Sequence, residues 1–135
     1  KKDRQMKKLG LLLLICGITT VGLAFTQSQP EAKFDKTVHD FGSIKEELGA
    51  VTTMFEFTNV GSSPLIIQRV SASCGCTTPS YPREPILPGK KGAISVKYST
   101  VARPGSFNKT IAVYTNVPDT VYVLTIKGNV IPKRQ

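Results

Sequence analysis

Short runs of residues that alternate apolar and polar side chains fill this chain from Thr37 to Ile126. In the run 51–58, Val51, Phe55 and Phe57 fall on one face, and polar residues fall on the other. Clusters of Gly, Pro, Asn and Ser separate the runs, and no stretch shows the 3.6-residue period of a helix. The pattern predicts an all-β protein, an immunoglobulin-like antiparallel β-sandwich of about seven strands.

The predicted strands supply enough large apolar side chains for one core. The predicted inward-facing sets are Val51, Phe55 and Phe57; Ile94, Val96 and Tyr98; Phe107, Ile111 and Val113; and Tyr122, Leu124 and Ile126. Burying each side chain contributes roughly 1.5–3 kcal/mol, so this core needs no metal or disulfide to fold. The first strand is predicted over 37–41 and ended by Gly42, and Gly128 is expected to follow the last strand.

The N-terminal segment 1–24 has the pattern of a secretory signal peptide. Lys7 and Lys8 precede an apolar run over 9–18, and the small residues of 22–24 suit cleavage by a signal peptidase. An uncleaved membrane anchor is the second interpretation, because the segment from Leu9 to Phe25 is about as long as the shortest membrane spans, roughly 17 residues. A lipoprotein built on Cys16 is the third. All three place the domain outside the cytoplasm, either in the periplasm or anchored to the membrane and facing the periplasm or the exterior.

Composition indicates where the folded domain begins and ends, and charge indicates which partners to expect. Residues 25–33 are predicted to be a polar linker, 34–131 the folded domain and 132–135 a tail. The net charge is +9, of which the N-terminal segment carries +4, and the other basic residues are scattered along the chain. Because the charge is not clustered and the protein is predicted to be exported, we expect no nucleic-acid partner. Contact with the membrane is expected only through the N-terminal segment.

The candidate contact loop is Cys74, Gly75, Cys76 and Thr77. In an exported protein two cysteines suggest a disulfide, which would require Gly75 to bend the chain and should be easily reduced. Two thiolates could instead bind a soft metal, Cu(I) or zinc, with His39 as the only available imidazole. The third interpretation, which we favour, is a structural pair that packs the loop beside a strand end.

Four prolines after the cysteines recur every three residues, at Pro79, Pro82, Pro85 and Pro88. Polyproline II has three residues per turn, so the four rings would line one edge of an extended segment, with Tyr81 beside them. We favour a stiff crossover along the rim of the sandwich. The alternative is a docking strip for a partner.

Catalytic residue sets are not evident in the sequence. The chain has one histidine, so no triad can be assembled beyond a pair of His39 with Cys74 or Cys76. No paired carboxylates, phosphate-binding loop or zinc-protease motif stands out. We therefore expect a protein that is not an enzyme and has no cofactor.

Five short motifs, taken together, resemble a known bacterial family. They occupy residues 39–44, 55–61, 73–77, 86–89 and 115–116. The set is similar to the DUF1573 family, which is related to the ASH and major-sperm-protein-like group of immunoglobulin-type domains. The resemblance covers about residues 34–130 and implies an exported immunoglobulin-like domain.

Function is implied only by analogy, because related ASH-type domains are mostly non-catalytic binding modules. The resemblance therefore favours binding to another envelope or surface protein, through the cysteine loop, the prolines or an exposed strand edge. The alternative is a thiol-based metal-handling or redox protein that uses Cys74 and Cys76.

Overall fold

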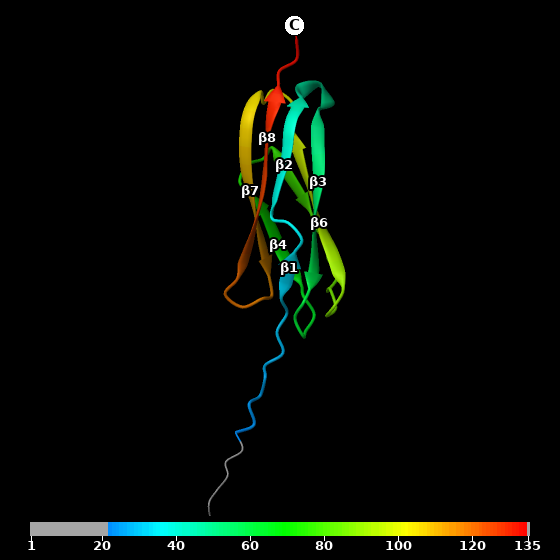
Figure 1. Ribbon diagram of the computed structural model, residues 1–135, viewed down its shortest axis with the longest axis vertical. Helices are drawn as coiled ribbons and strands as arrows, with labels where there is room; N and C mark the ends of the chain where they lie inside the picture. Colours follow the sequence, from blue (N-terminus) through cyan, green and yellow to red (C-terminus); the bar gives the residue numbers. More distant parts are fainter. Residues whose placement is uncertain (1–21, 135) are drawn as a thin grey trace, which may run out of the picture.

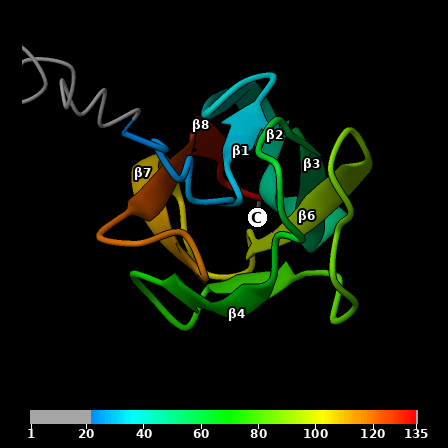
Figure 2. The same ribbon diagram turned by 90° about the horizontal axis from the view of Figure 1, so that it is seen from below.

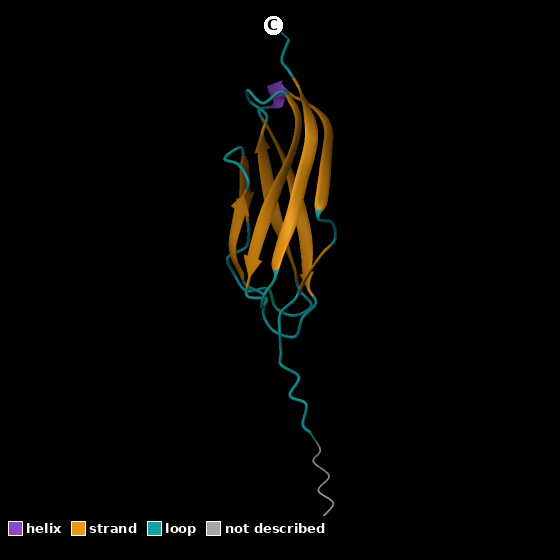
Figure 3. Cartoon of the chain, turned by 90° about the vertical axis from the view of Figure 1, so that its left-hand side faces the viewer, coloured by secondary structure: helices purple, strands orange, loops and turns teal. Residues whose placement is uncertain are grey.

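The computed structural model describes residues 22–134, and nearly all of its regular structure is β-strand. A single 3-10 turn, η1, follows the second strand (Figures 1 and 3). The elements are β1 Ala32–Phe34, β2 Val38–Lys45, η1 Glu46–Leu48, β3 Ala50–Asn59, β4 Ile67–Ala72, β5 Thr77–Ser80, β6 Lys91–Ser99, β7 Gly105–Thr115 and β8 Val121–Ile131. The prediction of an all-β immunoglobulin-like sandwich is confirmed.

Two four-stranded sheets form the two layers of the sandwich, seen end-on in Figure 2. Sheet A has the strand order β1-β3-β6-β5, and sheet B has the order β2-β8-β7-β4. The chain passes between the sheets five times, and two of these passages, β1 to β2 and β4 to β5, join edge strands. The cysteine loop makes the passage from β4 to β5. One pairing departs from the antiparallel prediction, because β2 runs parallel to β8.

The core lies between the sheets and contains the predicted inward-facing residues. The fully buried members include Phe55, Phe57, Ile94, Val96, Ile111, Val113, Leu124 and Ile126. Val51 and Tyr122 are partly buried and pack against this cluster. The period-two pattern therefore identified the buried face of β3, β6, β7 and β8, because alternate side chains in a strand point to opposite faces.

Two glycines that were predicted to end strands lie inside them. Gly42 adopts φ +67° at a register shift between β2 and β8, so β2 continues to Lys45 as a bulged strand. Gly128 lies within β8, opposite Phe107 of β7, and a Cβ atom at Gly128 would lie 2.9 Å from the Phe107 ring. The predictions were wrong because glycine marks bulges and close packing as well as turns.

The N-terminal segment leaves one end of the sandwich, which we call the proximal end (Figure 1). Residues 1–21, which hold most of the predicted signal or anchor segment, lie outside the described residues. In the described part of the chain, no helix is long and apolar enough to cross a membrane. The opposite end, which we call the distal end, is formed by η1, the loop 100–104 and the C-terminal residues 131–134.

Candidate functional site

The cystine turn, residues 74–77, carries the chain from sheet B to sheet A. Cys74 and Cys76 are joined as a disulfide, with their Cα atoms 5.3 Å apart. Thr77 N donates to the Cys74 carbonyl oxygen at 3.3 Å, which closes a tight turn, and Ser99 N donates to the Cys76 carbonyl oxygen at 2.9 Å. The Cα separation is ordinary for a disulfide, and Gly75 allows the bend without a positive φ.

The two sulfur atoms have different surroundings. Cys76 is 3% exposed and belongs to the core, whereas Cys74 is partly exposed at its margin. The Cys74 Sγ atom accepts a hydrogen bond from Cys76 N at 3.2 Å. The Thr77 Oγ1 atom lies 3.8 Å from Cys74 Sγ and 3.7 Å from Cys76 Sγ, and its hydroxyl is the only possible donor because disulfide sulfurs carry no hydrogen.

His39 is not near the cystine turn. It lies on β2 at one edge of sheet B, whereas Cys74 follows β4 at the other edge, with β8 and β7 between them. Neighbouring strands are about 4.8 Å apart, so the separation across the sheet is about 14 Å. Within residues 22–134, no three His, Cys, Asp or Glu side chains are close enough to hold a metal. The structure therefore does not form the three-ligand site of His39, Cys74 and Cys76.

The ring of His39 has local partners instead. Lys36 Nζ donates to His39 Nδ1 at 2.7 Å, and the ring meets Phe41 edge-on with centroids 4.5 Å apart. Burial lowers the pKa of His39, Lys36 lowers it further, and Asp40 opposes both effects. The carboxylate of Asp40 accepts from Gly42 N at 2.8 Å, at the bulge within β2.

The four prolines do not form one polyproline strip. Pro79 lies within β5 and pairs with β6, whereas Pro88 lies in a turn closed by Lys90 N and the Leu87 carbonyl oxygen. Tyr81 packs against the core. The guanidinium of Arg83 lies over its ring, 4.3 Å from the centroid, and donates to its hydroxyl oxygen at 2.9 Å. The predicted docking strip is therefore interrupted at two places, because β5 pairs with β6 and Ile86 pairs with Leu65.

Each of the four edge strands of the sandwich has a feature that discourages pairing with another chain. β1 has three residues, β2 is bulged at Gly42, β4 has an irregular register between Ile67 and Arg69, and β5 contains Pro79. Short, bulged or proline-containing edges resist the addition of a strand. The geometry therefore disfavours partner binding by strand addition.

A hollow of about 540 Å³ lies between η1 and the cystine turn. Its apolar lining comes from Leu48, Ala50 and Cys76, and its polar lining includes Thr78 and Lys97. Leu48 is 62% exposed, and Val101 of the adjoining loop is 59% exposed. This hollow, which we call the distal hollow, brings the cystine turn together with residues that the sequence analysis did not connect to it.

Glu46 holds the distal end together. Its side-chain oxygens accept from Ala102 N at 2.9 Å and from Lys133 N at 3.0 Å. Its carbonyl oxygen accepts from the hydroxyl of Thr100 at 3.0 Å and from Gly49 N at 3.0 Å. The two hydrogen bonds to backbone N–H groups lower the pKa of Glu46, because they stabilise its charged form.

Glu46→Gln is expected to destabilise the protein more at pH 7 than at pH 3. The folded-state pKa of Glu46 lies below its ordinary value of 4.5, so its contribution is present above that value. The contribution is lost as the pH falls from 4.5 through the lower folded pKa. Urea unfolding at both pH values measures the difference. Glu47→Gln, an exposed neighbour in η1, is the control and should show little change at either pH.

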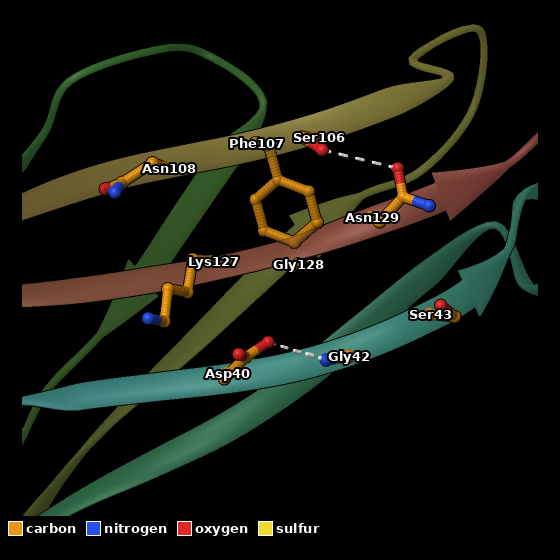
Figure 4. A pocket seen from close by; sticks show the side chains of 9 residues that line it. All are labelled: Asp40, Gly42, Ser43, Ser106, Phe107, Asn108, Lys127, Gly128 and Asn129. Carbon is orange, nitrogen blue, oxygen red and sulfur yellow. Dashed lines mark hydrogen bonds between the residues drawn. The ribbon is translucent and has the colours of Figure 1, made fainter.

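A second hollow lies on the outer face of sheet B, across β2, β8 and β7 (Figure 4). Asp40 and Lys127 are cross-strand partners there, and Ser106 Oγ lies 3.5 Å from Asn129 Oδ1. Figure 4 shows the Phe107 ring between β7 and β8, beside Gly128. The Asp40 carboxylate in this hollow is engaged by the backbone N–H of Gly42 at the bulge.

The two packed four-stranded sheets define an immunoglobulin-like sandwich, here with a disulfide-linked turn between its sheets. The chain belongs to the DUF1573 family, described as "Protein of unknown function", whose model matches residues 32–130. The resemblance predicted from the five motifs is thus confirmed. A comparison with curated proteins finds no match.

Solved structures share the fold at low sequence identity. A protein of unknown function from Porphyromonas gingivalis W83 has a TM-score of 0.65 and 20% identity, over 78% of this chain and 50% of that one. This chain thus spans half the length of that protein. A family 123 glycoside hydrolase from Clostridium perfringens has a TM-score of 0.59 and 13% identity, over 80% and 28% of the two chains. The VesB protease of Vibrio cholerae has a TM-score of 0.56 and 14% identity, over 76% of this chain and 31% of that one. These likenesses concern the fold.

Proposed function

We propose that this protein is an exported, non-catalytic binding module of the bacterial cell envelope, and that it contacts another envelope protein through its distal end. The observation that carries the proposal is the distal hollow, which is lined by the exposed Leu48, with the exposed Val101 in the loop at the same end of the sandwich. Exposed apolar side chains that gather around a hollow are typical of protein contact sites. The N-terminal segment leaves at the opposite end, so the hollow stays accessible whether that segment is cleaved or anchors the protein.

The charge around the hollow indicates the chemistry of the partner. Four basic residues lie at or near the distal end: Arg103 in the loop 100–104, Lys133 in the C-terminal residues, Lys45 at the end of β2, and Lys97 near the end of β6, where it lines the hollow. The carboxylate of Glu46 is engaged by two backbone N–H groups. A partner with an apolar side chain between carboxylates would complement this surface in shape and charge.

Site-specific photo-cross-linking in intact bacteria tests the binding site. A photoreactive residue in place of Leu48 is expected to give a discrete adduct with one envelope protein. The same residue in place of Leu87, which is 55% exposed in a proximal turn, is the matched control and should not give that adduct. The absence of an adduct from position 48, or the same adduct from both positions, would contradict the proposal.

Charge reversal tests the acidic character of the partner. Lys97→Glu should reduce the yield of the adduct from position 48 at least fivefold, because it places a like charge against the partner. Lys91→Glu, on the same strand but toward the proximal end, should leave the yield within twofold. Equal yields from the two variants would show that the partner does not use carboxylates at this site.

A further inference from the structure

We propose that the Cys74–Cys76 disulfide is redox-active and exchanges with thiols of a peptide or protein substrate. The first observation is that the cysteines are unequal, since Cys74 is partly exposed and Cys76 is 3% exposed. A substrate thiolate can therefore reach the sulfur of Cys74, while Cys76 stays inside and is the leaving group. The inference shares the distal hollow with the binding proposal, but its test follows disulfide exchange with a synthetic peptide and so can succeed or fail separately from that proposal.

The second observation is that hydrogen-bond donors converge on the accessible sulfur. Cys74 Sγ accepts from Cys76 N at 3.2 Å, and the Thr77 hydroxyl, 3.8 Å from Cys74 Sγ and 3.7 Å from Cys76 Sγ, can turn to Cys74 when that sulfur becomes a thiolate. A thiolate accepts such hydrogen bonds more strongly than a disulfide sulfur does, so they stabilise Cys74 once it is reduced. A stabilised thiolate is a better leaving group, and it makes the disulfide a stronger oxidant.

The third observation is that the fold does not depend on the disulfide. The ring spans one residue between the cysteines, and so short a loop constrains the unfolded chain far less than a long one. The turn is also held by backbone hydrogen bonds from Thr77 and Ser99. Reduction can therefore proceed while the sandwich stays folded.

The reaction is a two-electron exchange with a dithiol. One substrate thiolate attacks Cys74 Sγ, which forms a mixed disulfide and releases Cys76 as a thiolate that takes up a proton. The second substrate thiolate then attacks the substrate sulfur of the mixed disulfide and releases Cys74. The substrate dithiol is oxidised to a disulfide and the protein disulfide is reduced to two thiols. The distal hollow, lined by Gly75, Cys76 and Lys97, lies beside the turn and can receive the substrate chain.

A single-turnover experiment tests the proposal on the whole protein as it is exported. The oxidised protein is mixed without oxygen with a reduced synthetic peptide that carries two cysteines, then quenched with an alkylating agent. Mass spectrometry is expected to show one peptide disulfide formed for each protein in which Cys74 and Cys76 become alkylated. Near-UV circular dichroism should show that the reduced protein remains folded.

Substitutions of Thr77 separate a redox role from a structural one. Thr77→Val keeps the shape of this buried side chain, and it should slow the exchange and shift its equilibrium toward the protein disulfide, each about tenfold. Thr77→Ser restores the hydroxyl and should recover both, while Thr37→Val, at an exposed threonine before β2 and outside the hollow, should change neither. The proposal is overturned if the cysteines stay linked in excess dithiol peptide, or if Thr77→Val exchanges like the wild type.

Discussion

Asn59→Ala is expected to lower the free energy of unfolding by about 3–5 kcal/mol, the largest effect of any single polar side chain described here. Asn59 is 0% exposed at the end of β3. Its side-chain nitrogen donates to the carbonyl oxygens of Ser63 and Ile86, both at 2.9 Å. Its oxygen accepts from Gly61 N at 3.0 Å and from Glu31 N at 3.4 Å.

Alanine at this position would remove a partner from all four backbone groups, of which only the Ile86 carbonyl oxygen keeps another, Leu65 N at 2.8 Å. Each unsatisfied buried group costs about 1–3 kcal/mol, although some of the cost is relieved where water can enter. Urea unfolding of the wild type and the variant measures the loss. Asn108→Ala, on the exposed face of β7, should change stability by less than about 0.5 kcal/mol. If Asn59→Ala lowered the free energy of unfolding by less than about 1 kcal/mol, the hydrogen bonds of Asn59 would not have the stabilising role given to them here.

Gly61→Ala is expected to detach the N-terminal strand from sheet A and to cost about 2–4 kcal/mol. A Cβ atom at Gly61 would lie 2.4 Å from the carbonyl oxygen of Gln29 and 2.5 Å from Glu31 N. These are backbone atoms of the segment that enters β1, so they cannot move aside as the tip of a side chain could. The segment is fixed there by hydrogen bonds from Val60 N to Glu31 and from Ser62 N to Gln29.

Hydrogen exchange distinguishes local detachment from general unfolding in this variant. The amides of β1 should exchange much faster in Gly61→Ala, while those of β7 and β8 keep their relative protection. Gly75→Ala is the control, because no atom lies within 4 Å of a Cβ placed there. Unchanged protection of β1 in Gly61→Ala would show that the turn accommodates the methyl group.

Asn59 and Gly61 also show how far a sequence motif can be interpreted before the structure is known. Both lie in the motif 55–61, and the sequence predicted a turn there because Asn and Gly favour turns. The predicted turn is present, but the side chain of Asn59 also donates to the carbonyl oxygen of Ile86, 27 residues away. Such a role depends on which loops meet at one end of the sandwich, and local composition carries no information about that.

The candidate site was likewise predictable in part. Two cysteines with one residue between them are close in space in any conformation, so a disulfide was among the expected outcomes. His39 was a possible third ligand only because its place among the strands was unknown. The strand order puts it at the opposite edge of sheet B from Cys74, and this order follows from long-range pairing.

The sequence by itself determined the all-β class, the buried faces of the longer strands and the position of the cystine turn, because period-two alternation and turn residues act over a few neighbours. The tertiary structure alone decided what surrounds that turn. Glu46 joins Ala102 and Lys133, which are 56 and 87 residues away, and the distal hollow joins Leu48 to Cys76. Contacts between residues so distant in the chain arise only when the two sheets pack, since burial of their apolar faces fixes which loops lie together.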